Sequence, residues 1–113
     1  MPSITLNYHQ VSDRKVKAKS SLVIELLKKR GIAGNIASQM FCFHSPEYLI
    51  RKCWLLDYHH TQPGYVIVDD RRWLLASIRN DYNESDAFLA WLKDKKEDII
   101  KNGNDDLKRL IEI

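Results

Sequence analysis

Five residues with metal-ligating side chains fall within nineteen positions of this chain. They are Cys42, His44, Cys53, His59 and His60. Zinc accepts thiolate and imidazole ligands, but the chain has no Cys-x-x-Cys pair, which is the usual half of a small zinc site. Cys53 stands four residues after Leu49, a spacing that favours a small core residue on an apolar helix face. We therefore predict no metal and no cofactor, with a structural zinc site as the alternative.

The residue patterns of the common enzyme classes are absent. The chain has no glycine-rich phosphate loop, no Gly-x-Ser-x-Gly turn and no His-Glu-x-x-His helix. His59 and His60 lie near Asp57 and offer an acid–base pair, although a solvent-facing helix end is the simpler account. Asp69 and Asp70 are adjacent, so their side chains diverge, and helix capping explains them better than catalysis. We predict a protein that is not an enzyme.

Basic residues cluster near the N-terminus. Residues 14–30 hold seven Lys or Arg and one acid, residues 1–60 carry a net charge of +5, and residues 61–113 carry −2. Such clustering is typical of a protein that binds an anionic partner; the alternative is the solvated face of a surface helix. The predicted phosphate-binding residues are Lys15, Lys17, Lys19, Lys28, Lys29, Arg30, Arg51, Lys52, Arg71, Arg72 and Arg79.

Apolar residues at helical spacing predict a mainly α fold, a small bundle of five or six short helices. The predicted helices cover residues 16–30, 34–43, 45–58, 69–82, 85–101 and 105–113. Ser45 followed by Pro46, and Asp69 or Asp70, are predicted helix starts, and Asn83 with Asp86 resembles a capping pair. At most two short strands are expected, in residues 3–11 and 65–68, where an extended arm and an extended link are the alternatives.

The whole chain is predicted to form one helical domain over residues 1–113. Residues 1–15 are its extended arm or short strand, residues 16–82 its core and residues 83–113 its C-terminal helices. Short helices draw their stability from packing, so one shared core is expected. The predicted core residues are Leu22, Leu26, Ile36, Ala37, Met40, Leu49, Cys53, Leu56, Leu74, Ile78, Phe88 and Leu92.

A helix-turn-helix-like unit is predicted at the start of this core. Residues 20–30 and 35–43 are helices joined by Gly31-Ile32-Ala33-Gly34, and a third helix follows over residues 45–58. The outer face of one candidate recognition helix would carry Asn35, Ser38 and Gln39, and that of the other Glu47, Arg51 and Lys52. Neither is rich in arginine, so phosphate contacts are a better prediction than base-specific readout. Three packed helices without any nucleic-acid role are the alternative.

A family resemblance points the same way. Gly31-Ile32, Ala37, the run Ser-Pro-Glu-Tyr-Leu-Ile-Arg-Lys over residues 45–52 and the run Trp-Leu-Leu-Ala-Ser-Ile-Arg-Asn-Asp-Tyr over residues 73–82 occur in that order. This order resembles the helical segment of plasmid and phage replication initiator proteins and, more loosely, a helix of DnaD-like primosome proteins. The resemblance covers residues 20–82 and implies a DNA-associated module of replication initiation or helicase loading. Arg79 and Tyr82 are the polar and aromatic residues that match by position.

Composition sets the remaining expectations. The chain has 113 residues, 44% of them apolar, a net charge of +3 and two cysteines, as expected of one globular domain without a disulfide framework. No apolar run is long enough for a membrane span and no secretory signal is visible, so we expect a cytoplasmic protein without a membrane partner.

Two functional hypotheses follow. The first is a DNA-binding module that contacts phosphates through its basic residues, whose other partners would be replication proteins. The second is a protein–protein adaptor or homodimerisation module that uses the C-terminal helices. Its predicted partner-binding residues are Tyr82, Phe88, Trp91 and Leu92.

Overall fold

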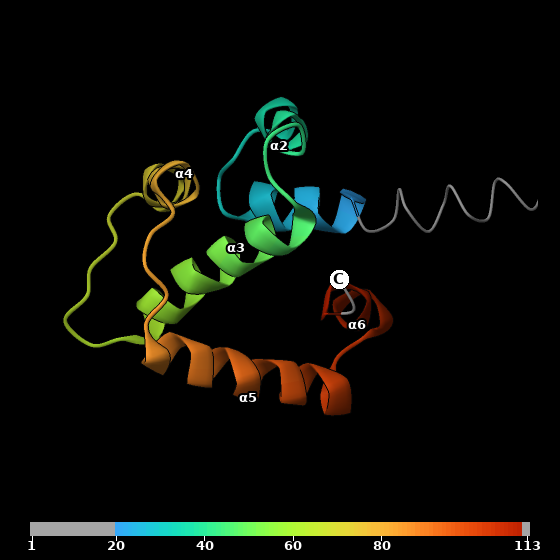
Figure 1. Cartoon of the computed structure of the whole chain (residues 1–113), viewed down its shortest axis with the longest axis vertical. Coiled ribbons are helices and arrows are strands. Elements are labelled where there is room, and N and C mark those ends of the chain that lie inside the picture. The colour runs from blue at the N-terminus through green and yellow to red at the C-terminus, as the bar shows by residue number, and fades with distance from the viewer. Residues whose placement is uncertain (1–19, 112–113) are drawn as a thin grey trace, which may run out of the picture.

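The computed structural model describes residues 20–111, and over this range the chain is mainly helical, as the sequence predicts (Figure 1). An N-terminal helix is described over residues 20–29. It is followed by α2 (Gly34–Met40), α3 (Pro46–Thr61), α4 (Asp70–Asn80), α5 (Asp86–Asn102) and α6 (Asp105–Ile111). Residues 20–111 contain no strand, and residues 65–68 form a link without regular secondary structure. The predicted arm over residues 1–15 lies outside the described residues.

Helix α3 is the central element. It runs through the middle of Figure 1, with the N-terminal helix and α2 on one side and α5 on the other. Its buried residues are Leu49, Ile50, Lys52, Cys53, Trp54, Leu55, Leu56 and Tyr58. Because they occupy nearly consecutive positions, burial extends around most of the helix circumference. Helices α4 and α5 both pack directly against α3.

The helix starts follow the predicted capping chemistry in two of three cases. The side chains of Ser45, Asp69 and Ser85 accept hydrogen bonds from the backbone N–H groups of Tyr48, Arg72 and Phe88. Ser45 and Asp69 were predicted, whereas the pairing of Asn83 with Asp86 is wrong, because Ser85 caps α5. Helix α2 is shorter than predicted: it ends at Met40, and residues 41–43 form a turn.

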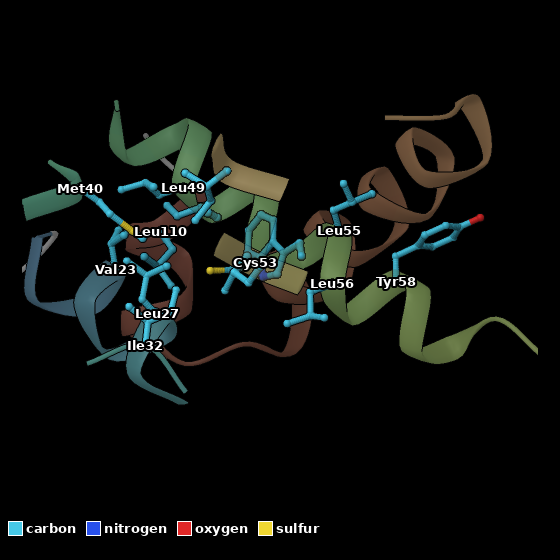
Figure 2. Packing of buried hydrophobic residues seen from close by; sticks show 14 of the residues in the cluster. Val23, Leu27, Ile32, Met40, Leu49, Cys53, Leu55, Leu56, Tyr58 and Leu110 are labelled. Atoms are coloured by element: carbon cyan, nitrogen blue, oxygen red, sulfur yellow. The ribbon is translucent and has the colours of Figure 1, made fainter. Parts of the chain in front are cut away.

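The observed core contains nine of the twelve predicted residues. The exceptions are Leu22 and Leu26, which are half-buried, and Ile36, which is exposed. The N-terminal helix instead buries Val23 and Leu27, one turn apart. Apolar residues at 22, 23, 24, 26 and 27 fit two helix registers equally well, and only the position of α3 selects one. Figure 2 shows Leu110 of α6 in the same cluster as Val23 and Leu27.

Gly31 allows the end of the N-terminal helix to approach α4. Its φ of +94° is rarely adopted by other residues, and a Cβ atom there would lie 3.3 Å from the Cβ atom of Arg71. Gly31 is the first residue of the predicted turn Gly31-Ile32-Ala33-Gly34, and the helix before it ends at residue 29. The close approach brings Lys29 and Arg71, which are 42 positions apart in the sequence, to one depression on the surface.

Candidate nucleic-acid interface

The predicted phosphate-binding residues occupy different environments. Lys15, Lys17 and Lys19 lie outside the described residues. Exposed positions are held by Lys28, Lys29, Arg51, Arg71, Arg72 and Arg79, whereas Arg30 is half-buried and Lys52 is fully buried. Only the exposed side chains are able to reach the phosphates of a bound nucleic acid.

Lys52 is a correction to the predicted phosphate-binding set. Its side chain is 0% exposed, and its ammonium group donates a hydrogen bond to the backbone carbonyl of Tyr82 at 2.6 Å. The same group pairs with Asp81 at 2.8 Å and with Glu84 at 3.2 Å. Lys52 therefore ties α3 to residues 81–84 and is inaccessible to phosphate. Its partners lie about thirty positions away in the chain, so helical spacing alone gives no signal of this role.

Arg30 also has an internal partner. Its guanidinium group donates to both carboxylate oxygens of Asp57, at 3.1 and 2.5 Å, and to the backbone carbonyl of Leu26 at 2.7 Å. Burial opposes its charge, but the hydrogen bond to Asp57 and the surrounding negative charges outweigh burial and raise the pKa of Arg30 above its usual value. Arg30 thus links the N-terminal helix to α3, which makes it a structural residue. The alternative of an acid–base pair between Asp57 and His59 or His60 is not formed, because the Asp57 carboxylate accepts both its hydrogen bonds from Arg30.

The acids around α4 are each engaged by a neighbouring group. Asp57 pairs with Arg30, Asp69 caps α4, Asp70 contacts His60 at 2.8 Å, Asp81 pairs with Lys52, and Glu84 pairs with both Arg51 and Lys52. Among residues 20–111, by contrast, Lys29, Arg71 and Arg79 form no ion pair, and Arg72 has only a long contact of 3.6 Å with Asp69. Among the described residues, the charges of Lys29, Arg71 and Arg79 are therefore not neutralised by an ion pair.

We call these cations the arginine face: Lys29 together with Arg71, Arg72 and Arg79 of α4. Lys29 and Arg71 line an open depression of about 590 Å³ beside Gly31, and Asp69 and Asp70 belong to the same lining. Arg72 and Arg79 are seven residues apart on one side of α4, a rise of about 10 Å along its axis. Leu74 and Ile78 face the core, so they hold α4 in place while its arginines remain in solvent.

The two candidate recognition helices differ in how much of their surface is exposed. The N-terminal helix and α2 occur in the predicted order, and Asn35, Ser38 and Gln39 are exposed on α2. The second candidate corresponds to α3. Its predicted role as a recognition helix is wrong, because α3 is the central buried helix. Its Arg51 is exposed but pairs with Glu84, so it offers no outer face for a nucleic-acid groove.

The predicted partner surface on α5 also needs correction. Phe88 is 0% exposed and Leu92 is 5% exposed, so both are core residues. Trp91 is half-buried, with its ring 5.6 Å from that of Tyr58, while Tyr82 lies at the surface against Trp73. A helical pattern shows which residues share a face but not which face meets the core. The large apolar residues that α5 does expose are Leu89 and Ile100.

The metal-ligating residues are not brought together. Among the residues that the structure describes, no three His, Cys, Asp or Glu side chains gather as a metal site requires. Cys53 is buried as predicted and Cys42 is exposed. His59 stacks on Tyr65 with ring centres 4.2 Å apart, and burial lowers the pKa of His59.

We expect the two thiols to differ sharply in reactivity. Burial raises the pKa of Cys53 to about 12, so almost no thiolate is present at neutral pH. Cys42 is exposed and should be alkylated readily. Mass spectrometry after iodoacetamide treatment should show one modification in the native protein and two after denaturation in urea. Rapid native labelling of Cys53 would contradict the observed packing of α3.

The described helices include none that is both long and apolar enough to cross a bilayer. Comparison of the chain with protein-family models, with curated proteins and with solved structures finds no match. The functional conclusions therefore rest on the arrangement of the chain's own residues, and above all on the arginine face.

Proposed function

We propose that this chain binds DNA by contacting phosphates through the arginine face. The observation that carries the proposal is the charge arrangement around α4, where nearby acids are engaged by neighbouring groups while the arginines point to solvent. Arginine suits this role because its planar guanidinium group donates two parallel hydrogen bonds to phosphate oxygens. Phosphate contacts of this kind position a nucleic acid without reading its sequence.

Two further features support the proposal. The sequence places Arg14, Lys15, Lys17 and Lys19 shortly before the N-terminal helix, which adds positive charge to the half of the chain that contains Lys29. In addition, the run that resembles the replication-initiator helix, residues 73–82, forms most of α4 and includes Arg79. The resemblance and the arginine face thus fall on the same helix. This agreement supports DNA bound during replication initiation or helicase loading as the partner.

The test is fluorescence anisotropy of a labelled oligonucleotide, single- and double-stranded, across a salt series. We expect affinity to fall linearly on a log–log plot, because bound cations release the counterions of the DNA. Replacing Arg71, Arg72 and Arg79 together by alanine should reduce the slope by roughly 2–3 units, as expected for three lost phosphate contacts.

A matched variant separates a binding surface from a general charge effect. Lys93, Lys96 and Lys101 are exposed on α5, and replacing them by alanine removes the same total charge. This control should retain a slope close to that of the unmodified protein. Equal losses in both triple variants, or no binding to any DNA at low salt, would refute the proposal.

A further inference from the structure

An open apolar groove of about 340 Å³ lies between α2 and α4. Met40, Leu75 and Ile78 provide its apolar lining, and Gln39, Phe43 and Arg79 surround them. Its volume is at the lower end of the range for small-molecule sites, where one planar ring is a suitable occupant. The groove is therefore small, apolar inside and bordered by an amide and a guanidinium group.

Phe43 is the unusual residue of this groove. Its side chain is 82% exposed, although phenylalanine is most often buried. The backbone around it is held in a turn: the N–H group of Phe43 donates to the carbonyl of Met40 at 3.1 Å, and the N–H group of His44 donates to the same carbonyl at 2.9 Å. An aromatic ring presented to solvent on a hydrogen-bonded turn is well placed to stack on a flat ligand.

The groove wall is also held in place by side chains. Tyr48 of α3 donates its hydroxyl hydrogen bond to the backbone carbonyl of Ile78 at 2.7 Å, which fixes α4 against α3. The ring of His44 stacks on the ring of Tyr48 with their centres 5.0 Å apart. Because these contacts are made within the chain, the groove is formed before any ligand arrives.

The arginine face continues into this groove. Arg72, Leu75 and Arg79 are spaced three and four residues apart on α4, so they lie along one side of the helix. Leu75 and Arg79 both line the groove. A nucleic-acid strand whose phosphates contact Arg72 and Arg79 would run along the side of α4 on which Leu75 and Arg79 line the groove.

We propose that the α2–α4 groove holds one unstacked base of single-stranded DNA, with Phe43 stacking on the base and Arg79 contacting the adjacent phosphate. Aromatic rings beside a basic track are how proteins bind single strands with little sequence preference. Gln39 adds an amide that both donates and accepts hydrogen bonds at a base edge. This inference rests on the proposed function, and it specifies single strands as the preferred substrate because bases in a duplex remain stacked on their neighbours.

The experiment compares two labelled strands of equal length, oligo(dT) and an abasic strand with the same sugar–phosphate charge. The unmodified protein should bind oligo(dT) about tenfold more tightly than the abasic strand, within the range expected for stacking of one base. Phe43→Ala should remove this preference and leave binding to the abasic strand unchanged. The substitution should not affect folding, because the ring is mostly in solvent.

Val66→Ala is the matched control, since Val66 is also 82% exposed but does not line the groove. It should keep the full preference for oligo(dT). Equal, salt-sensitive binding of both strands by the unmodified protein would overturn the groove assignment and leave the proposed function standing. A preference that survives in Phe43→Ala would also overturn it. Absence of binding to either strand would overturn both, and an apolar peptide would then be the next occupant to test.

Discussion

Phe88→Ala is expected to lower the free energy of unfolding by about 3–5 kcal/mol, because it removes a fully buried aromatic ring and leaves a cavity. Phe88 joins α5 to the central helix: its ring lies 5.6 Å from that of Tyr58, nearly edge-on, and 6.0 Å from that of Trp91. A loss of this size is a large fraction of the stability of a small domain. Urea denaturation followed by circular dichroism measures it directly.

Leu89→Ala is the control for Phe88→Ala. Leu89 is the next residue on α5 but is 42% exposed, so its replacement should cost less than about 1 kcal/mol. The sequence predicts both a core role and a partner-binding role for Phe88, and the pair of variants distinguishes the two. If Phe88→Ala were as stable as Leu89→Ala, the observed packing of α5 on α3 would be wrong.

Lys52→Met should give the second large effect, a loss of about 2–3 kcal/mol in the free energy of unfolding. Methionine fills a similar volume, so the loss comes mainly from the missing charge and hydrogen bonds. The carbonyl of Tyr82 and the largely buried carboxylate of Glu84 would each lose a hydrogen-bond donor. Denaturant unfolding at neutral pH is the measurement.

Acid should reduce the difference between Lys52→Met and the unmodified protein. The hydrogen bond and charge of Lys52 lower the pKa of Asp81 below its usual value. A lowered pKa in the folded state stabilises the fold above the unfolded pKa, about 3.9, and this contribution disappears as the pH falls through the folded pKa. The free energies of unfolding of the two proteins should therefore approach each other as the pH falls below about 4, while the part of the difference that comes from the Tyr82 carbonyl should remain.

Arg51→Met is the matched control for the lysine variant. Arg51 pairs with the same Glu84, but its side chain is 47% exposed, and water replaces such a pair at little cost. We expect a loss below about 1 kcal/mol. Equal losses in the free energy of unfolding for Arg51→Met and Lys52→Met would contradict this prediction. They would show that the burial of Lys52 has no energetic consequence.

Much of the secondary structure could be predicted from local sequence. Helix ends are marked by Ser45 with Pro46, Asp69 and Gly31 through chemistry that involves only a few neighbouring residues. The mainly α class follows from the same signals combined with helical apolar spacing. The predicted core of α3 and α4 was largely right, because their apolar residues leave little choice of face.

The candidate site could be predicted only in part. The sequence indicated Arg71, Arg72 and Arg79 as exposed cations, and the structure agrees. It did not separate them from Lys52 and Arg30, whose carboxylate partners lie 27 or more positions away in the chain. Phe43 is the last residue of the helix predicted over residues 34–43. Its exposure depends on α2 ending at Met40, which local apolar spacing does not reveal.

The sequence by itself determined where most of the helices begin and that most of them must pack into a shared core, because capping and amphipathic spacing are local properties. Only the tertiary structure decided which charges are internal and which face solvent. A basic side chain has the same chemistry whether it is buried or exposed. Which of the two it is depends on contacts between distant helices, and local sequence does not show these. The packing of α4 against α3 thus buries Lys52, leaves the arginine face exposed and forms the groove beside Phe43.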